Sequence, residues 1–122
     1  MRERIPVIIC LPFPDMSLSP NRKNGKHWTT TKKAKDSRFT SAYYATLEAM
    51  ARELKPANIS ALEISFIEPD KRKRDLDNML SSIKQDIDGI CKAVGIDDKC
   101  FDVVTLRRGY RKDDGYLIVR LG

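Results

Sequence analysis

Apolar and polar side chains alternate over residues 60–67, a pattern that predicts a strand. The apolar side chains of this stretch are Leu62, Ile64 and Phe66. Residues 4–11, 101–108 and 116–121 are also rich in strand-forming residues, and we expect a strand in each. The last two stretches are separated by Asp113-Asp114-Gly115, a composition typical of turns, which predicts that they pair as a hairpin.

Two longer stretches have apolar residues at helical spacing. The first predicted helix begins at Thr29, Thr30 or Thr31, each a suitable cap, and runs to about Leu54, before Pro56. The second covers residues 76–94 and ends at Gly95, since glycine often follows a helix. Its apolar side chains recur every three or four positions and form one stripe: Leu76, Met79, Leu80, Ile83, Ile87, Ile90 and Val94.

These elements follow one another in the order β-α-β-α-β-β. A chain with this order of elements most simply forms a two-layer α/β (α+β) domain, in which helices pack on a mixed sheet. The 122 residues suffice for one hydrophobic core, and we expect a single domain over residues 1–122.

The amino-acid composition limits the kinds of molecule that the protein is expected to bind. The net charge of +6 favours an acidic partner such as nucleic acid, although many basic proteins bind none. The three cysteines are odd in number and form no CxxC, and with one histidine they exclude a zinc framework, so we expect a reducing, cytoplasmic setting. No stretch approaches the roughly 18 apolar residues of a membrane span.

Carboxylates stand directly beside a basic run. Asp75-Leu76-Asp77-Asn78 follows Lys71, Arg72, Lys73 and Arg74, and Asp97-Asp98 comes about twenty residues later. Cations of this kind attract phosphates, and clustered carboxylates are tolerable there mainly when a divalent cation lies between them. Each pair also has a structural interpretation, because aspartate caps helices, suits the helix dipole and is common in turns.

A second basic segment lies before the first predicted helix. It combines cations with polar and aromatic side chains: Asn21, Arg22, Lys23, Lys26, His27 and Trp28. This composition suits DNA, since an aromatic ring can stack on a base. The alternatives are a solvated loop and a tryptophan that belongs to the core.

A polar side of the second predicted helix carries Asp77, Ser81, Lys84 and Asp88. On a helical wheel the four fall within about 60° of one another, beside the apolar stripe. They could therefore face a groove, or they could be ordinary solvated residues.

The segment Pro69-Asp70-Lys71-Arg72-Lys73-Arg74-Asp75-Leu76-Asp77-Asn78 resembles the signature of the RusA family of Holliday junction resolvases, in particular its phage and prophage members. The resemblance extends to Leu11-Pro12-Phe13-Pro14 and to Leu18-Ser19-Pro20-Asn21 with His27-Trp28. It also includes Asp97-Asp98 ahead of Val103-Val104.

This resemblance implies a homodimeric, Mg²⁺-dependent endonuclease, with Mn²⁺ as an alternative, that makes paired nicks in four-way DNA junctions during recombination and repair. It implies that Asp75, Asp77 and Asp98 are the catalytic, metal-binding carboxylates. The family's essential lysine would fall at Ser81, and Lys84, three residues later, is the nearest candidate. Two alternatives stay open: a non-catalytic DNA-binding module, and a metal nuclease for other branched or duplex DNA.

Overall fold

The computed structural model describes residues 7–14, 28–52, 59–72 and 74–122. Its elements, in chain order, are β1 (Val7–Pro12), α1 (Trp28–Arg52), β2 (Ala61–Glu68), α2 (Leu76–Ser82), α3 (Lys84–Val94), the 3₁₀ helix η3 (Asp98–Cys100), β3 (Val103–Tyr110) and β4 (Tyr116–Leu121). The predicted strands and the first predicted helix are present, with boundaries shifted by a few residues.

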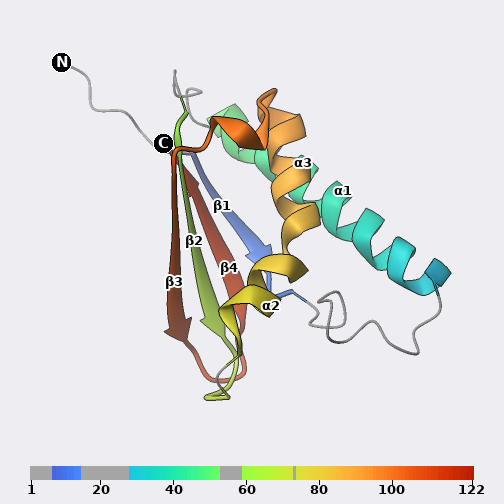
Figure 1. Ribbon diagram of the computed structural model, residues 1–122, viewed down its shortest axis with the longest axis vertical. Coiled ribbons are helices and arrows are strands. Elements are labelled where there is room, and N and C mark those ends of the chain that lie inside the picture. Colours follow the sequence, from blue (N-terminus) through green and yellow to red (C-terminus); the bar gives the residue numbers. More distant parts are fainter. Residues whose placement is uncertain (1–6, 15–27, 53–58, 73) are drawn as a thin grey trace.

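The four strands form one mixed sheet in the order β1-β4-β2-β3. Strand β4 pairs antiparallel with β1 and β2, whereas β2 and β3 run parallel. The helices lie along one face of this sheet (Figure 1). The expected two-layer α+β architecture with a mixed sheet is therefore confirmed.

The predicted hairpin of β3 and β4 is wrong, because β2 lies between the two strands. The connection passes the end of β2, where the backbone N–H of Asp113 donates to the carbonyl of Pro69 at 2.9 Å. A Cβ at Gly115 would lie 2.8 Å from Pro69 Cδ, so glycine is needed where the chain crosses. Strand β4 has three buried apolar side chains and takes a central position, while the less buried β3 takes the edge.

The single helix predicted over residues 76–94 is also wrong, since Ile83 divides it into α2 and α3. At the break, the Ser82 hydroxyl donates to the carbonyl of Met79 at 2.6 Å, and the N–H of Ile83 bonds the carbonyl of Leu80, three residues back. A serine that bonds the preceding turn competes with the helical hydrogen-bond ladder and bends it. Met79, Ile83, Ile90 and Val94 of the apolar stripe are buried as expected, whereas Leu76 and Leu80 are exposed, and the stripe did not predict this break.

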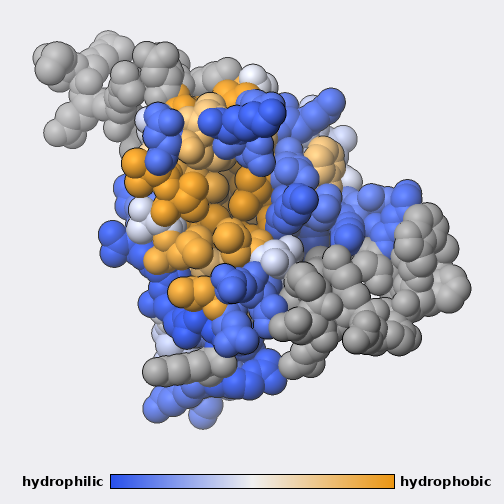
Figure 2. All heavy atoms as spheres, viewed as in Figure 1, coloured by the Kyte–Doolittle hydropathy of each residue, from blue (hydrophilic) through white to orange (hydrophobic). Residues whose placement is uncertain are grey.

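The helices cover β1, β4 and β2 but leave β3 largely uncovered. Each of the first three strands has buried positions on alternate residues, whereas no residue of β3 is buried. Figure 2 shows hydrophobic side chains in the area between β3 and helices α2 and α3, bordered by hydrophilic ones.

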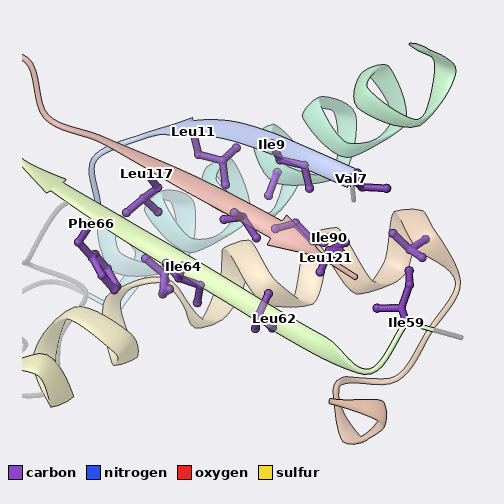
Figure 3. Packing of buried hydrophobic residues seen from close by; sticks show 14 of the residues in the cluster. Val7, Ile9, Leu11, Ile59, Leu62, Ile64, Phe66, Ile90, Leu117 and Leu121 are labelled. Carbon is purple, nitrogen blue, oxygen red and sulfur yellow. The ribbon is translucent and has the colours of Figure 1, made fainter. Parts of the chain in front are cut away.

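The hydrophobic core lies between the sheet and helices α1 and α3 (Figure 3). Phe66 and Ile64 of β2 are fully buried in it, as is Leu117 of β4. The two helices approach closely at Gly89, where a Cβ would lie 2.4 Å from the carbonyl oxygen of Phe39. Among the described residues, no helix combines the length and apolar character required to span a membrane.

Candidate active site

Asp75 and Asp77 lie at the start of α2, and both are exposed. Asp75 is the N-cap residue in extended conformation, and its carbonyl accepts the first helical hydrogen bond, from the N–H of Met79 at 3.0 Å. Its carboxylate, however, makes no capping hydrogen bond within the described residues. The predicted cap position is thus confirmed, while the carboxylate oxygens are not used to cap the helix.

Arg74 anchors the loop that leads into this helix. Its Nη1 donates to Glu68 at 3.4 Å and to Asp70 at 3.1 Å, and its Nη2 bonds the second oxygen of Asp70 at 3.1 Å. Its guanidinium lies 5.1 Å from the ring centroid of Phe13. Arg108 of β3 donates to the backbone carbonyl of Arg74. These contacts connect the loop to β2, to β3 and to Phe13, which follows β1, and so position the residues that follow the loop.

The basic run therefore contains two kinds of cation. The Arg74 side chain is only 8% exposed and is paired with carboxylates, which differs from the phosphate contact expected for it. Its hydrogen bonds lower the pKa of Asp70. Lys71 and Arg72 are exposed, with Lys71 Nζ 5.9 Å from the Tyr110 ring centroid, and Lys73 lies outside the described residues.

Most residues of the second basic segment lie outside the part of the chain that the structure describes. Helix α1 begins at Trp28, but the placement of its side chain is not described. The other predicted DNA contacts of this segment lie outside the described residues: Asn21, Arg22, Lys23, Lys26 and His27.

The two neighbouring aspartates after α3 differ in their bonding. The carboxylate of Asp97 caps η3 by accepting the N–H of Lys99 at 2.9 Å. This hydrogen bond from the backbone of Lys99 lowers the pKa of Asp97. Asp98 is exposed in η3 itself. Of the two, Asp97 has the structural role, which leaves Asp98 as the better candidate for a functional carboxylate.

Asp98 is far from Asp75 and Asp77 within one chain. Helix α3 has eleven residues, which span about 16 Å, and it separates η3 from the start of α2 (Figure 1). Within the described ranges, no three acidic, histidine or cysteine side chains lie close enough to hold a metal together. The chain therefore places two of the candidate carboxylates at the start of α2 and the third beyond the far end of α3.

A pair of carboxylates is still a suitable donor set for Mg²⁺. This ion keeps several waters and is usually held by one or two carboxylates together with substrate phosphates. Asp75 and Asp77 are exposed at the start of α2, a few residues after the exposed cations Lys71 and Arg72, so the residue types at the start of this helix suit the ion.

Ser81 and Lys84 lie on either side of the helix break. Both are exposed, with Ser81 in the last turn of α2 and Lys84 at the first position of α3. The helical wheel that placed them on one side assumed an unbroken helix, so that argument no longer holds.

The sequence analysis missed a buried ion pair. Arg38 of α1 donates through Nε to Asp86 of α3 at 2.8 Å, and through Nη1 to the carbonyl of Pro12 at 3.0 Å. Burial raises the pKa of Asp86 to about 6, against the lowering effect of Arg38. The signal was available, because Asp86 is three residues after Ile83 and four before Ile90, in the apolar stripe itself.

Comparison with known proteins finds a relative of this chain but does not identify its family. No family model matches the chain. A protein of Xylella fastidiosa (strain Temecula1 / ATCC 700964), described as "Uncharacterized protein", is 41% identical over an alignment of 101 residues, and the match covers 76% of this chain and 61% of the relative. The chain thus spans about three fifths of the length of the curated relative that it matches. The resemblance to junction resolvases therefore stays a prediction.

Proposed function

We propose that this protein is a metal-dependent endonuclease that resolves four-way DNA junctions by paired nicks. The observation that carries the proposal is that Asp75 and Asp77 are exposed at the start of α2, with the Asp75 carboxylate not used for capping, a few residues after the exposed cations Lys71 and Arg72. Oxygen ligands for a hard cation adjoin side chains that attract phosphates, which is the combination that phosphodiester hydrolysis requires.

Each residue has a defined role in this proposal. Asp75 and Asp77 hold Mg²⁺, or Mn²⁺ in its place, and Lys71 and Arg72 hold the DNA backbone. The metal, when bound, supplies Lewis-acid stabilisation of the phosphate and an activated water. Arg74 positions the loop, and Lys84 places a positive charge near the start of α3, where it can offset charge on the phosphate.

Asp98 can join Asp75 and Asp77 at the proposed metal site only if two copies of the chain form a dimer. Its place beyond the far end of α3 keeps it away from the paired carboxylates of its own chain. In a two-fold homodimer, Asp98 of a second copy is free to approach them, and each subunit addresses one of the two equivalent strands of the junction. A cytoplasmic setting is part of the proposal, since the three cysteines are free in the described residues.

The decisive experiment compares DNA substrates and one conservative substitution. Wild type, Asp75→Asn and the control Asp113→Asn are incubated with Mg²⁺ and a synthetic four-way junction, a linear duplex or a flap. Asp113 is exposed with φ 61°, a conformation that asparagine tolerates well, so its substitution tests only the loss of a surface carboxylate. We expect Asp75→Asn to lose at least about 100-fold in junction cleavage, with binding retained, because asparagine can still occupy the cap position.

The same experiment separates the alternatives. A wild-type protein that cuts no substrate would overturn the nuclease proposal. Junction binding without cleavage would instead support a non-catalytic DNA-binding module, the alternative favoured by the lack of a three-ligand group in the described residues. Equal cleavage of all three substrates would indicate a metal nuclease without junction selectivity.

A further inference from the structure

Arg107 and Arg108 are neighbours on β3 but point to opposite faces of the sheet. The parallel register pairs Arg108 with Phe66, which is buried in the core on the helix side, and pairs Arg107 with Ser65. Because successive side chains of a strand alternate between its faces, Arg108 lies on the helix side and Arg107 on the outer side. Both are exposed, and Arg107 forms an ion pair with Glu63 of β2. The two arginines therefore reach different surroundings from adjacent positions.

Arg108 bonds the residue that precedes Asp75. Its Nη2 donates to the backbone carbonyl of Arg74, whose carbonyl carbon is joined to the Asp75 nitrogen. Standard backbone dimensions therefore put the Asp75 Cα within about 6 Å of the Arg108 guanidinium. The edge strand β3 thus places a positive charge at the start of α2, where the proposed metal-binding carboxylates are exposed.

The charge of Arg108 is not used in an ion pair within the part of the chain that the structure describes. The carboxylates at the end of β2 and in the loop after it, Glu68 and Asp70, are held by Arg74 instead. One guanidinium nitrogen of Arg108 bonds a carbonyl, and among the described residues no hydrogen bond is made by the other two. A guanidinium in this state can still donate two parallel hydrogen bonds to a phosphate.

The same face of β3 also meets one of the cations proposed to hold DNA. Tyr110 follows Arg108 by two residues, so both point to the helix side of the sheet. Tyr110 is exposed, and Lys71 Nζ lies 5.9 Å from its ring centroid. The loop thus meets β3 at Tyr110 through Lys71 and at Arg108 through Arg74. A DNA strand that follows Lys71 toward Asp75 therefore reaches Arg108 on the way.

Lys84, the cation on the helices themselves, is further from Asp75 than Arg108 is. The seven residues of α2 span about 10 Å and separate Lys84 from Asp75, with the break at Ile83 between the two helices. Arg108, in contrast, bonds the residue next to Asp75. It comes from a strand outside α2 and α3, so the spacing of residues around the carboxylates gives no sign of it.

We propose that Arg108 is a catalytic residue, which donates to the phosphate held at Asp75 and Asp77 and stabilises the negative charge that develops there during hydrolysis. Water loses a proton as its oxygen bonds to phosphorus, and the leaving 3′-oxygen takes up a proton as its bond breaks. Arg108 keeps its protons throughout, since arginine stays charged in proteins. The inference rests on the proposed function for the reaction and adds a residue to the site.

The two neighbouring arginines provide matched variants. Single-turnover cleavage of a synthetic four-way junction is measured with Mg²⁺ at saturating protein, and circular dichroism checks that each variant is folded. We expect Arg108→Gln to cleave at least about 100-fold more slowly than wild type, and Arg107→Gln to cleave as fast as wild type. Arg108→Lys keeps the charge without the planar fork, so its rate should lie between those of wild type and Arg108→Gln. Equal rates for Arg107→Gln and Arg108→Gln, or no recovery in Arg108→Lys, would overturn the assigned role.

A binding measurement without metal separates a phosphate contact from mere anchoring of the loop. We expect Arg108→Gln to reduce the slope of log junction affinity against log salt by about 1, and Arg107→Gln to leave it unchanged. An unchanged slope for Arg108→Gln, or equal reductions in both variants, would overturn the phosphate contact. If wild type cuts no DNA while Arg108→Gln still reduces the slope, the proposed nuclease fails and the contact stands. If wild type cuts the junction and Arg108→Gln cuts it equally fast, only the role of Arg108 fails.

Discussion

Arg74 and Glu68 form an ion pair whose side chains are only 8% and 7% exposed, at the point where the loop toward α2 leaves β2. We expect Arg74→Met to lower the free energy of unfolding by about 3 kcal/mol, because it leaves the Glu68 carboxylate buried without its partner. Urea unfolding followed by circular dichroism measures this change.

Two variants serve as controls for the ion pair. Arg72→Met removes an exposed arginine two residues away, and we expect a change within about 0.5 kcal/mol. Adding Glu68→Gln to Arg74→Met removes the unpaired charge and should restore part of the stability. If Arg72→Met and Arg74→Met destabilise equally, the anchoring role of Arg74 is wrong.

The exposed and buried arginines of the basic run should also differ in DNA binding. We expect Arg72→Ala to weaken junction binding at low salt and to reduce the slope of log affinity against log salt by about 1, since one phosphate contact is lost. Arg74→Lys should leave this slope unchanged, because its partners are carboxylates. Fluorescence anisotropy over a range of salt concentrations measures both slopes. A reduced slope for Arg74→Lys would show that Arg74 does contact the DNA backbone.

The fold was predictable where burial follows a simple period. The alternation around Ile64 and the helical stripe through Ile90 identified buried faces that the structure confirms. Strand order was not predictable in the same way, because Asp113-Asp114-Gly115 has the same composition whether the chain turns back or crosses a neighbouring strand. That choice depends on which strand buries more apolar surface, and β4 buries more than β3.

The candidate site was predictable in its residues but less so in its geometry. The sequence placed Asp75 at a helix start, yet it could not distinguish the buried Arg74 from the exposed Arg72, since their difference depends on Glu68 and Asp70. Nor could it locate Asp98, whose distance from Asp75 depends on the direction of α3 after the break at Ile83.

Replacement by alanine should lower the free energy of unfolding by different amounts at Gly89 and at Gly95. A Cβ at Gly89 meets the backbone of α1, 2.4 Å from the Phe39 carbonyl oxygen, so we expect Gly89→Ala to force the helices apart and to cost about 3 kcal/mol. Gly95 has open space but a φ of 83°, and Gly95→Ala should cost about 1 kcal/mol. Urea unfolding compares the two variants, and equal costs would contradict the close approach of the helices.

Lys84 and Ser81 can be separated by substitution at each position. If Lys84 offsets charge at the phosphate, we expect Lys84→Ala to reduce junction cleavage by about 100-fold with little change in unfolding free energy, since the side chain is exposed. Ser81→Ala should retain cleavage. Single-turnover cleavage rates decide between them, and full activity of Lys84→Ala would remove this residue from the proposed site.

The buried carboxyl group of Asp86 predicts a pH dependence of stability. Burial raises its pKa to about 6 in the folded protein, above the value of about 3.9 expected in the unfolded chain. The folded state therefore binds the proton more tightly, so this contribution is fully present below about pH 4 and is lost as the pH rises through about 6, by up to about 3 kcal/mol. Asp86→Asn cannot titrate, and the difference in unfolding free energy between wild type and this variant should fall over that pH range. A difference that stays constant, or that grows with pH, would show that Arg38 holds Asp86 ionised throughout.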